Sequence, residues 1–258
     1  MRLLSVAAAV LVLALVPGCT SDDGDGGAGS GGQGGDLPTD AKLTTYFDAV
    51  GSYDPEQLAD AQEIAADGSP AQGYAAYLAG YSAAAIAAGQ AIDDAEVKQV
   101  DDGFEACGGT GNADECVTWA DLEGADGELT DFTVSGTSLD DALVDLTGQA
   151  PIEASGLYTV QPEYAYRSPQ SGTLYVVVTI TAGDVPLAPR PGLYIDQDTT
   201  ITGEQTRSPA SIEPGASSPV VLAFPEAQDA GLAGSVTFGM KVGDSRESIG
   251  FDLVDPAA

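Results

Sequence analysis

The chain has 258 residues, of which 40 are acidic and eight are basic, and its formal net charge is −32. This charge excludes nucleic acid as an expected partner, because phosphate binding needs clustered Lys and Arg. The sequence contains no histidine, which excludes Ser-His-Asp and Cys-His catalytic arrangements and the commonest zinc ligand. We therefore expect a protein without a cofactor or a metal, and one that is not an enzyme.

The N-terminus has the pattern of a secretion signal. Arg2 is the single charge before an apolar run over residues 3–16, which is long enough for a signal peptide and short for a membrane span. Cys19 follows directly. The segment resembles the bacterial lipoprotein signal, or lipobox, in which the cysteine receives a diacylglycerol. Val16 and Gly18 fit that pattern and Pro17 departs from it.

This resemblance implies a signal peptide over residues 1–18 and an extracytoplasmic protein that lipidated Cys19 anchors to the outer face of the cell membrane. Two acyl chains would hold it stably, whereas one would not. An ordinary secretory signal, or a short membrane anchor, with an incidental cysteine is the alternative. The bias toward small residues and the scarcity of lysine resemble actinobacterial lipoproteins.

The segment over residues 19–38 is predicted to be a disordered tether after the cysteine, because it is rich in Gly, Asp and Ser. Its aspartates do not have the spacing of a calcium loop. The charge then divides unevenly, with a net −21 over residues 39–150 and a net −8 over residues 151–258. This asymmetry favours two modules with a boundary near residue 150.

Cys107 and Cys116 are the remaining cysteines, and they enclose the Gly-rich stretch CGGTGNADEC. Outside the cytosol, two cysteines around a tight turn indicate a disulfide. A metal site would need further suitable ligands nearby, and the sequence offers none. We therefore expect a structural disulfide between Cys107 and Cys116.

Three helices are expected in the first module. An apolar stripe over residues 43–50 ends at Gly51, and Asp54-Pro55 and Ser69-Pro70 are start signals for two more helices, ending near Gly68 and Gly89. The last helix carries the stripe Tyr74, Tyr77, Leu78, Tyr81 and Ala85. We interpret this stripe as core that packs on a sheet, with the lining of a pocket as the alternative.

Strand patterns follow the helices. Residues 97–104 form a weak strand, and the runs 116–122 and 129–134 flank Asp126-Gly127, a hairpin signal. Helices followed by antiparallel strands indicate an α+β domain. The order, with the stretches DPEQLADAQEIAADGSPAQGYAAYLAGY and CVTWADLEGADGELTDFTVSG, resembles the cone-shaped NTF2-like fold. That resemblance implies a cone that holds a pocket or forms an assembly surface.

The second module is expected to be an all-β sandwich. A short helix over residues 136–149 connects it, and about seven alternating runs then follow between Pro- and Gly-rich turns. They lie at 157–167, 173–182, 193–195, 199–206, 219–224, 235–243 and 248–253. The stretch IEPGASSPVVLAF resembles an edge of Ig-like modules in secreted bacterial proteins.

A carboxylate pair is the one catalytic arrangement that the composition leaves open. Acids crowd around one predicted hairpin and could serve general acid and base chemistry, but a chain with 40 acids forms such clusters by chance. They are Asp121, Glu123, Asp126, Glu128 and Asp131. We expect solvated surface groups rather than a catalytic pair.

The leading functional hypothesis is a membrane-tethered, non-catalytic module that contacts another protein of the envelope. The alternative is a lipoprotein that binds a small molecule in an apolar cone. In that case Tyr74, Tyr77, Tyr81 and Trp119 would line the pocket. The two hypotheses differ in whether the protein's own side chains fill the cone.

Overall fold

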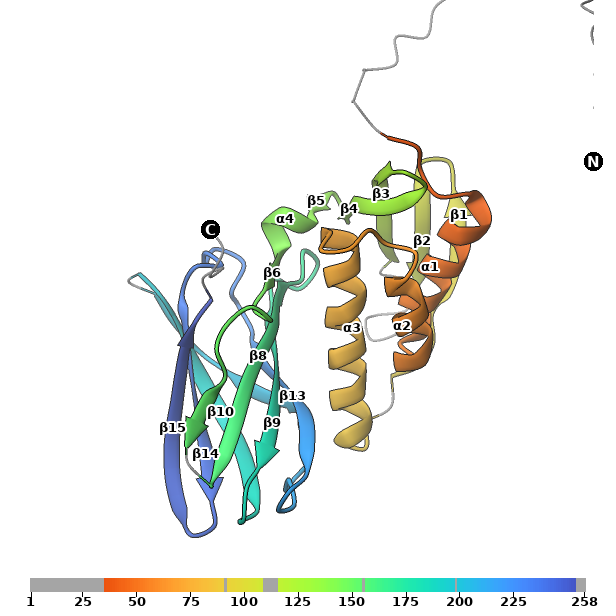
Figure 1. Ribbon diagram of the computed structural model, residues 1–258. Helices are drawn as coiled ribbons and strands as arrows, with labels where there is room; N and C mark the ends of the chain where they lie inside the picture. The colour runs from red at the N-terminus through yellow and green to blue at the C-terminus, as the bar shows by residue number, and fades with distance from the viewer. Residues whose placement is uncertain (1–34, 91, 109–115, 155, 198, 254–258) are drawn as a thin grey trace, which may run out of the picture. The chain divides into compact units, whose positions relative to one another are not determined.

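The computed structural model describes residues 35–90, 92–108, 116–154, 156–197 and 199–253. The chain from Gly34 to Ala258 forms one compact unit. It combines helices with antiparallel sheets, so the fold is α+β with a β-rich C-terminal part, as expected (Figure 1). None of the helices in the described ranges has the length and hydrophobicity needed to span a membrane. Cys19, the expected signal peptide and nearly all of the expected tether lie outside these ranges.

The three N-terminal helices are α1 (Asp40–Ser52), α2 (Pro55–Gln62) and α3 (Pro70–Ala87). Asp54 and Ser69 cap α2 and α3 as predicted, each with proline at the first helical position. Helix α2 ends earlier than the predicted Gly68. The backbone of residues 64–66 exchanges hydrogen bonds with Leu129 instead, and this pairing replaces further helical turns.

The first sheet follows the helices and has the order β1-β2-β3-β4-β5. Its strands are β1 (Glu96–Val100), β2 (Gly103–Cys107), β3 (Cys116–Ala125), β4 (Glu128–Val134) and β5 (Thr137–Ser138). The predicted hairpin at Asp126-Gly127 is confirmed, and both residues have the positive φ of a type I′ turn. The single strand predicted over residues 97–104 is wrong, because the chain reverses at Asp101-Asp102 and forms β1 and β2.

The connecting helix predicted over residues 136–149 is also wrong for most of its length. Only one turn forms, α4 (Leu139–Ala142), and the chain then extends as β6 (Leu143–Asp145). Strand β6 pairs with residues 164–166, further along the chain. Pairing with this strand edge satisfies the backbone N–H and C=O groups of residues 143–145. This gain outweighs the helical preference that the spacing of the apolar residues suggested.

Two further sheets make up the C-terminal part. One has the order β12-β13-β9-β8-β6, with β7 also on β8, and the other has the order β11-β10-β14-β15. The strands are β7 (Ile152–Ala154), β8 (Tyr158–Arg167), β9 (Leu174–Ala182), β10 (Leu187–Asp196), β11 (Thr199–Thr202), β12 (Glu204–Arg207), β13 (Ser217–Phe224), β14 (Ser235–Val242) and β15 (Ser245–Asp252).

The run predicted as one strand over residues 199–206 is two strands in different sheets. The break lies at Gly203, where an added Cβ would be 2.7 Å from the ring of Phe224. Only glycine fits such a close approach. The chain therefore crosses from one sheet to the other at this residue.

The described residues form two hydrophobic cores. One fills the space between the two C-terminal sheets, and the other joins α1–α4, the first sheet and residues of β8, β9 and β13. Strand β9 serves both, because Val176 and Val178 face the first of these cores and Val177 faces the second. Helix α3 thus lies between the β1–β5 sheet and the β8–β9–β13 face (Figure 1).

Candidate functional site

A cavity of about 220 Å³ lies where α3, the first sheet and the β8–β9 face meet. It contains all four residues that the sequence suggested for a pocket, namely Tyr74, Tyr77, Tyr81 and Trp119. The other lining residues are Val50, Gly51, Tyr53, Leu78, Ala95, Ala106, Gly108, Val117, Val134, Tyr166, Ser168, Pro169, Gln170, Ser171 and Tyr175. We call this cavity the aromatic pocket.

Helix α3 supplies three of the tyrosines from one face. Tyr74, Tyr77 and Tyr81 follow the i, i+3, i+7 spacing that aligns side chains along a helix. Tyr77 lies between its two neighbours, with ring centroids 6.2 Å from Tyr74 and 6.0 Å from Tyr81. The stripe is buried, so it serves both as core and as the wall of the pocket.

Glycines bring α3 close to β9 at one point and to β6 at another. A Cβ at Gly80 would lie 2.8 Å from Val177 Cγ1, and one at Gly73 would lie 3.2 Å from Leu143 Cδ2. The first distance is below any normal carbon contact, so only glycine allows the helix to approach this far. This spacing determines where the tyrosine stripe meets the opposite wall.

Sequence reasoning missed three tyrosines that complete the lining, Tyr53, Tyr166 and Tyr175. Tyr166 and Tyr175 are directly opposite each other in the β8–β9 pair. The Tyr166 ring centroid is 4.8 Å from that of Tyr77. Strand alternation predicts that both side chains point to the sheet face opposite the core between the two C-terminal sheets. The sequence does not show that α3 covers that face.

Tyr53 reaches the pocket from a helix end. It follows α1 in the left-handed conformation, with a φ of 52°. Its carbonyl accepts a hydrogen bond from the buried Ser82 hydroxyl of α3. This bond fixes the end of α1 against α3 and places the Tyr53 side chain at the pocket.

The pocket is electrically neutral in a strongly acidic protein. None of its lining residues is Asp, Glu, Lys or Arg. Burial raises the pKa of Tyr74, Tyr77 and Tyr166 above the usual value of 10.0, and neighbouring tyrosines raise it further. These phenols are therefore protonated at neutral pH, and each can donate or accept a hydrogen bond.

One cation, Arg207, stacks on a tyrosine of the lining. Its guanidinium carbon lies 4.6 Å above the centre of the Tyr81 ring. The charge partly offsets the rise that burial causes in the pKa of Tyr81. This cation–π contact occupies a face of the ring, so Arg207 supports the wall without lining the pocket.

Trp119 has an unusual environment within the described part of the chain. It is 3% exposed, yet its indole N–H has no hydrogen-bond partner. The indole N–H lies beside the Tyr74 hydroxyl and acts on the pKa of Tyr74 as a hydrogen-bond donor, lowering it against the larger effect of burial, although the pair falls outside the geometry of a formed hydrogen bond. A buried donor without a partner costs about 1–3 kcal/mol; the Trp119 ring lines the pocket, while its nitrogen is covered by protein.

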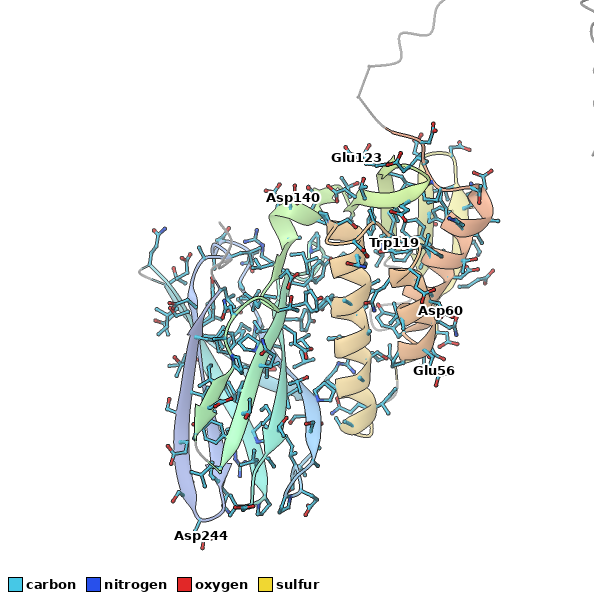
Figure 2. All side chains as sticks on the ribbon, viewed as in Figure 1. Glu56, Asp60, Trp119, Glu123, Asp140 and Asp244 are labelled. Carbon is cyan, nitrogen blue, oxygen red and sulfur yellow. A yellow bond between two sulfur atoms is a disulfide. The ribbon has the colours of Figure 1, made fainter. Side chains whose placement is uncertain are left out.

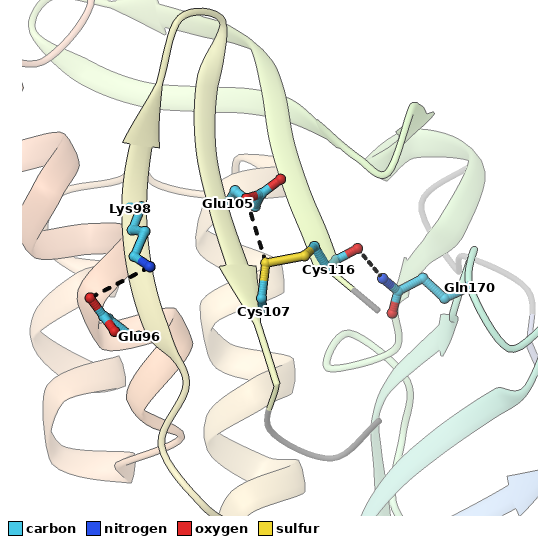
Figure 3. The surroundings of a disulfide bond; sticks show 6 residues. All are labelled: Glu96, Lys98, Glu105, Cys107, Cys116 and Gln170. Carbon is cyan, nitrogen blue, oxygen red and sulfur yellow. Dashed lines mark hydrogen bonds and ion pairs between the residues drawn. A yellow bond between two sulfur atoms is a disulfide. The ribbon is translucent and has the colours of Figure 1, made fainter. Parts of the chain in front are cut away.

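The disulfide is located beside the pocket. Cys107 and Cys116 are bonded, as the sequence predicted, and join the ends of β2 and β3 (Figure 3). The Gln170 side-chain amide donates a hydrogen bond of 2.8 Å to the Cys116 carbonyl. Gly108 and residues 168–171 line the pocket at this end, so the contact ties the hairpin to the β8–β9 turn.

The same cysteines and Glu105 form a group whose possible ligand atoms lie within 4.8 Å of one another. The carboxylate oxygen of Glu105 is 3.5 Å from Cys107 Sγ. The bonded sulfurs carry no proton to donate and are not the thiolates that metals prefer. This group therefore fits a structural disulfide rather than a metal site.

The acidic hairpin residues do not line the pocket. Asp121, Glu123, Asp126 and Glu128 are exposed, and only Asp131 is half-buried. Burial, with Asp140 and Glu123 nearby, raises the pKa of Asp131. Figure 2 shows Glu123 near the hairpin and Trp119 further along the same strand, next to the helices. Of these carboxylates only Glu128 borders a described cavity, a second one that Glu63 and Asp67 also line.

No protein-family model matches the chain, and no curated protein matches it significantly. The site is therefore assigned from its own geometry.

Proposed function

We propose that this protein is an extracytoplasmic lipoprotein that binds a small molecule in the aromatic pocket. The observation that carries the proposal is a cavity of about 220 Å³ lined by six tyrosines and one tryptophan. Ligand sites are concave and mostly apolar, with a few convergent polar groups. An interior of packed side chains alone would leave few voids larger than a water molecule.

Binding without catalysis is the simplest chemistry for this site. The pocket offers phenol, indole, amide and hydroxyl groups, and it lacks a carboxylate or a cation to move a proton. The chain has no histidine. The one carboxylate cluster considered for catalysis lies on a hairpin outside the lining.

The architecture agrees with this use. We infer that the helices with the β1–β5 sheet form an NTF2-like cone and that β8–β15 form an Ig-like sandwich. In this interpretation, the β8–β9 face closes the open side of the cone. The pocket would then belong to both parts of the chain, since Tyr77 comes from one and Tyr166 from the other.

The single tryptophan makes the proposal testable. Trp119 is the only tryptophan in the chain, and it lines the pocket. We expect a library of small neutral compounds to contain members that change its fluorescence saturably and raise the melting temperature. If no compound does either, the pocket is a water-filled packing defect and the proposal is wrong.

The anchor needs its own test. We propose that Cys19 carries the lipid, which the residues preceding it support. Cys19→Ala should release the protein from the membrane fraction of cells into the medium, because alanine cannot receive the acyl chains that would hold the protein at the membrane. Cys107→Ala is the matched control and should leave the protein with the membrane. Retention of the Cys19→Ala protein would contradict the lipoprotein assignment.

Contact with an envelope protein remains a second prediction. Leu193 and Ile195 of β10 are 40% and 39% exposed on the outer face of the β11-β10-β14-β15 sheet. Two exposed apolar side chains on one face of a strand can contribute to a small interface. Charged substitutions at both positions should abolish any partner crosslinked to the wild-type chain in intact cells.

A further inference from the structure

We propose that the aromatic pocket binds an uncharged, polyhydroxylated ring of the size of a monosaccharide. This inference rests on the proposed binding function and specifies its ligand class. Three features of the lining support it, namely open phenol hydroxyls, a neutral aromatic wall and a polar entrance.

Two phenol hydroxyls from different walls are open to the pocket. Among the described residues, the side-chain atoms that are both inaccessible and unpaired are Trp119 Nε1 and Ser135 Oγ. Tyr77 of α3 is 3% exposed, and its hydroxyl makes no hydrogen bond to a described residue, yet it is not one of these atoms. This hydroxyl therefore retains accessible surface, and the space beside it is the pocket. The same holds for the hydroxyl of the half-buried Tyr175 of β9, which also lines the cavity.

Further phenols gather around the Tyr77 hydroxyl. Burial raises the pKa of Tyr77, and four neighbouring phenols raise it further. They are Tyr81, Tyr166, Tyr175 and Tyr74. The Tyr81 ring connects the two open hydroxyls, since its centroid is 6.0 Å from that of Tyr77 and 5.4 Å from that of Tyr175.

A group of neutral hydroxyls is complementary to a ligand that carries several hydroxyls on a compact frame. A phenol hydroxyl donates and accepts hydrogen bonds, and so does each hydroxyl of a polyol. A hydrocarbon of the same shape would displace water from Tyr77 and Tyr175 without replacing its hydrogen bonds, which lowers affinity. The open hydroxyls therefore favour a polyol over a purely apolar ligand.

The wall favours a neutral ring. The lining has no Asp, Glu, Lys or Arg, so an ionised ligand would lose its hydration and find no opposite charge. The net charge of −32 disfavours anions further. The rings of Tyr74, Tyr77 and Tyr166 lie at centroid distances of 4.8–6.2 Å with planes inclined by 36–64°. The negative face of an aromatic ring attracts weakly positive groups, such as the C–H bonds on the face of a sugar ring.

The entrance is polar and also uncharged. Gln170 and Ser171 are the exposed residues of the lining, so the pocket reaches the surface beside the β8–β9 turn. The Gln170 amide N–H donates to the Cys116 carbonyl, which holds this side chain in place (Figure 3). The Gln170 amide oxygen accepts no hydrogen bond from a described residue. It can therefore accept one from a ligand hydroxyl.

The size of the pocket limits the ligand to one ring. A volume of about 220 Å³ is equivalent to roughly seven water molecules of liquid. This volume suits a single six-membered ring with its substituents better than a nucleotide or an acyl chain.

A panel of small rings tests the class on the full-length protein. The neutral probes are glucose, galactose, mannose and myo-inositol. The controls are glucuronate, an anion, glucosamine, a cation, and cyclohexanol, a ring with a single hydroxyl. We expect at least one neutral probe to bind saturably in titrations of Trp119 fluorescence, and each control to bind about tenfold more weakly or not at all. If no neutral probe binds, or if a control binds as tightly, the proposed class is wrong.

Variants that keep each ring and remove its hydroxyl test the open phenols. Tyr77→Phe and Tyr175→Phe should each weaken the polyol that binds best by about tenfold in calorimetry. Tyr158→Phe, outside the lining, is the matched control and should leave the affinity unchanged. Because the Tyr77 hydroxyl has no hydrogen-bond partner among the described residues, Tyr77→Phe should keep the melting temperature of the wild type. Unchanged affinity in both pocket variants would contradict the role of these hydroxyls.

The two levels of the proposal fail in different ways. If no polyol of the panel binds but other neutral library compounds do, the ligand class is wrong and the binding function stands. If nothing in the library binds, both fail.

Discussion

Replacing Tyr77 by alanine distinguishes a pocket wall from ordinary core. Phe132 is the matched residue, because both side chains are nearly fully buried and each contacts three other rings. Phe132 does not line the pocket, whereas Tyr77 does. The two substitutions therefore remove similar side chains from environments that differ in one respect.

The expected costs follow from what surrounds each ring. Phe132→Ala should lower the free energy of unfolding by about 3–5 kcal/mol, since it opens a new cavity in close-packed core. Tyr77→Ala should cost about 2–3 kcal/mol, because the ring already borders empty volume and loses fewer contacts. Both losses are tolerable for a domain of ordinary stability, about 5–15 kcal/mol.

Urea denaturation followed by circular dichroism measures both costs, with the disulfide kept oxidised. The same proteins are titrated with a compound that binds the wild type, and Tyr77→Ala should weaken binding more than Phe132→Ala does. If Tyr77→Ala costs as much stability as Phe132→Ala and leaves binding unchanged, Tyr77 is ordinary core. The assignment of the pocket would then be refuted.

Three further predictions follow from the surroundings of the pocket. Gly80→Val should lower the free energy of unfolding by about 1–3 kcal/mol, because even a Cβ at this position would lie 2.8 Å from Val177. An unchanged urea midpoint of unfolding would contradict the close approach of α3. Replacing Cys107 and Cys116 together by serine should lower the free energy of unfolding by about 2–3 kcal/mol, since the disulfide closes a loop with a sequence separation of nine. An unchanged melting temperature would contradict a stabilising role of the disulfide. Burial raises the pKa of phenols such as Tyr77 above the value in the unfolded chain. Their contribution to the free energy of unfolding is therefore complete below about pH 10, and it is lost as the pH rises through the pKa of the folded state. The phenolate absorbance of these buried tyrosines should therefore appear together with unfolding, and reversible titration of every tyrosine near pH 10 in the folded protein would contradict this burial.

Much of the local structure can be predicted from the sequence. Asp54-Pro55 and Ser69-Pro70 start helices because a side-chain oxygen caps free backbone N–H groups and proline fits the first turn. Asp126-Gly127 forms the predicted hairpin because both positions need a positive φ. These signals act over a few residues, so they do not depend on the rest of the fold.

The tertiary structure decided the features that depend on distant partners. Residues 143–145 have helical spacing but form β6, because β8 offers an open edge. The run over residues 199–206 divides at Gly203, where the chain passes Phe224. Neither outcome can be predicted locally, because the competing hydrogen bonds come from segments far away in the chain.

The pocket shows both contributions. The sequence by itself determined that Tyr74, Tyr77 and Tyr81 share one face of a helix, because the helical period fixes their direction. The sequence also suggested Trp119, whereas only the tertiary structure brought Tyr166 and Tyr175 to the same cavity. The reason is physical, since α3 is apolar on several sides and its burial between two sheets depends on packing that no single segment encodes.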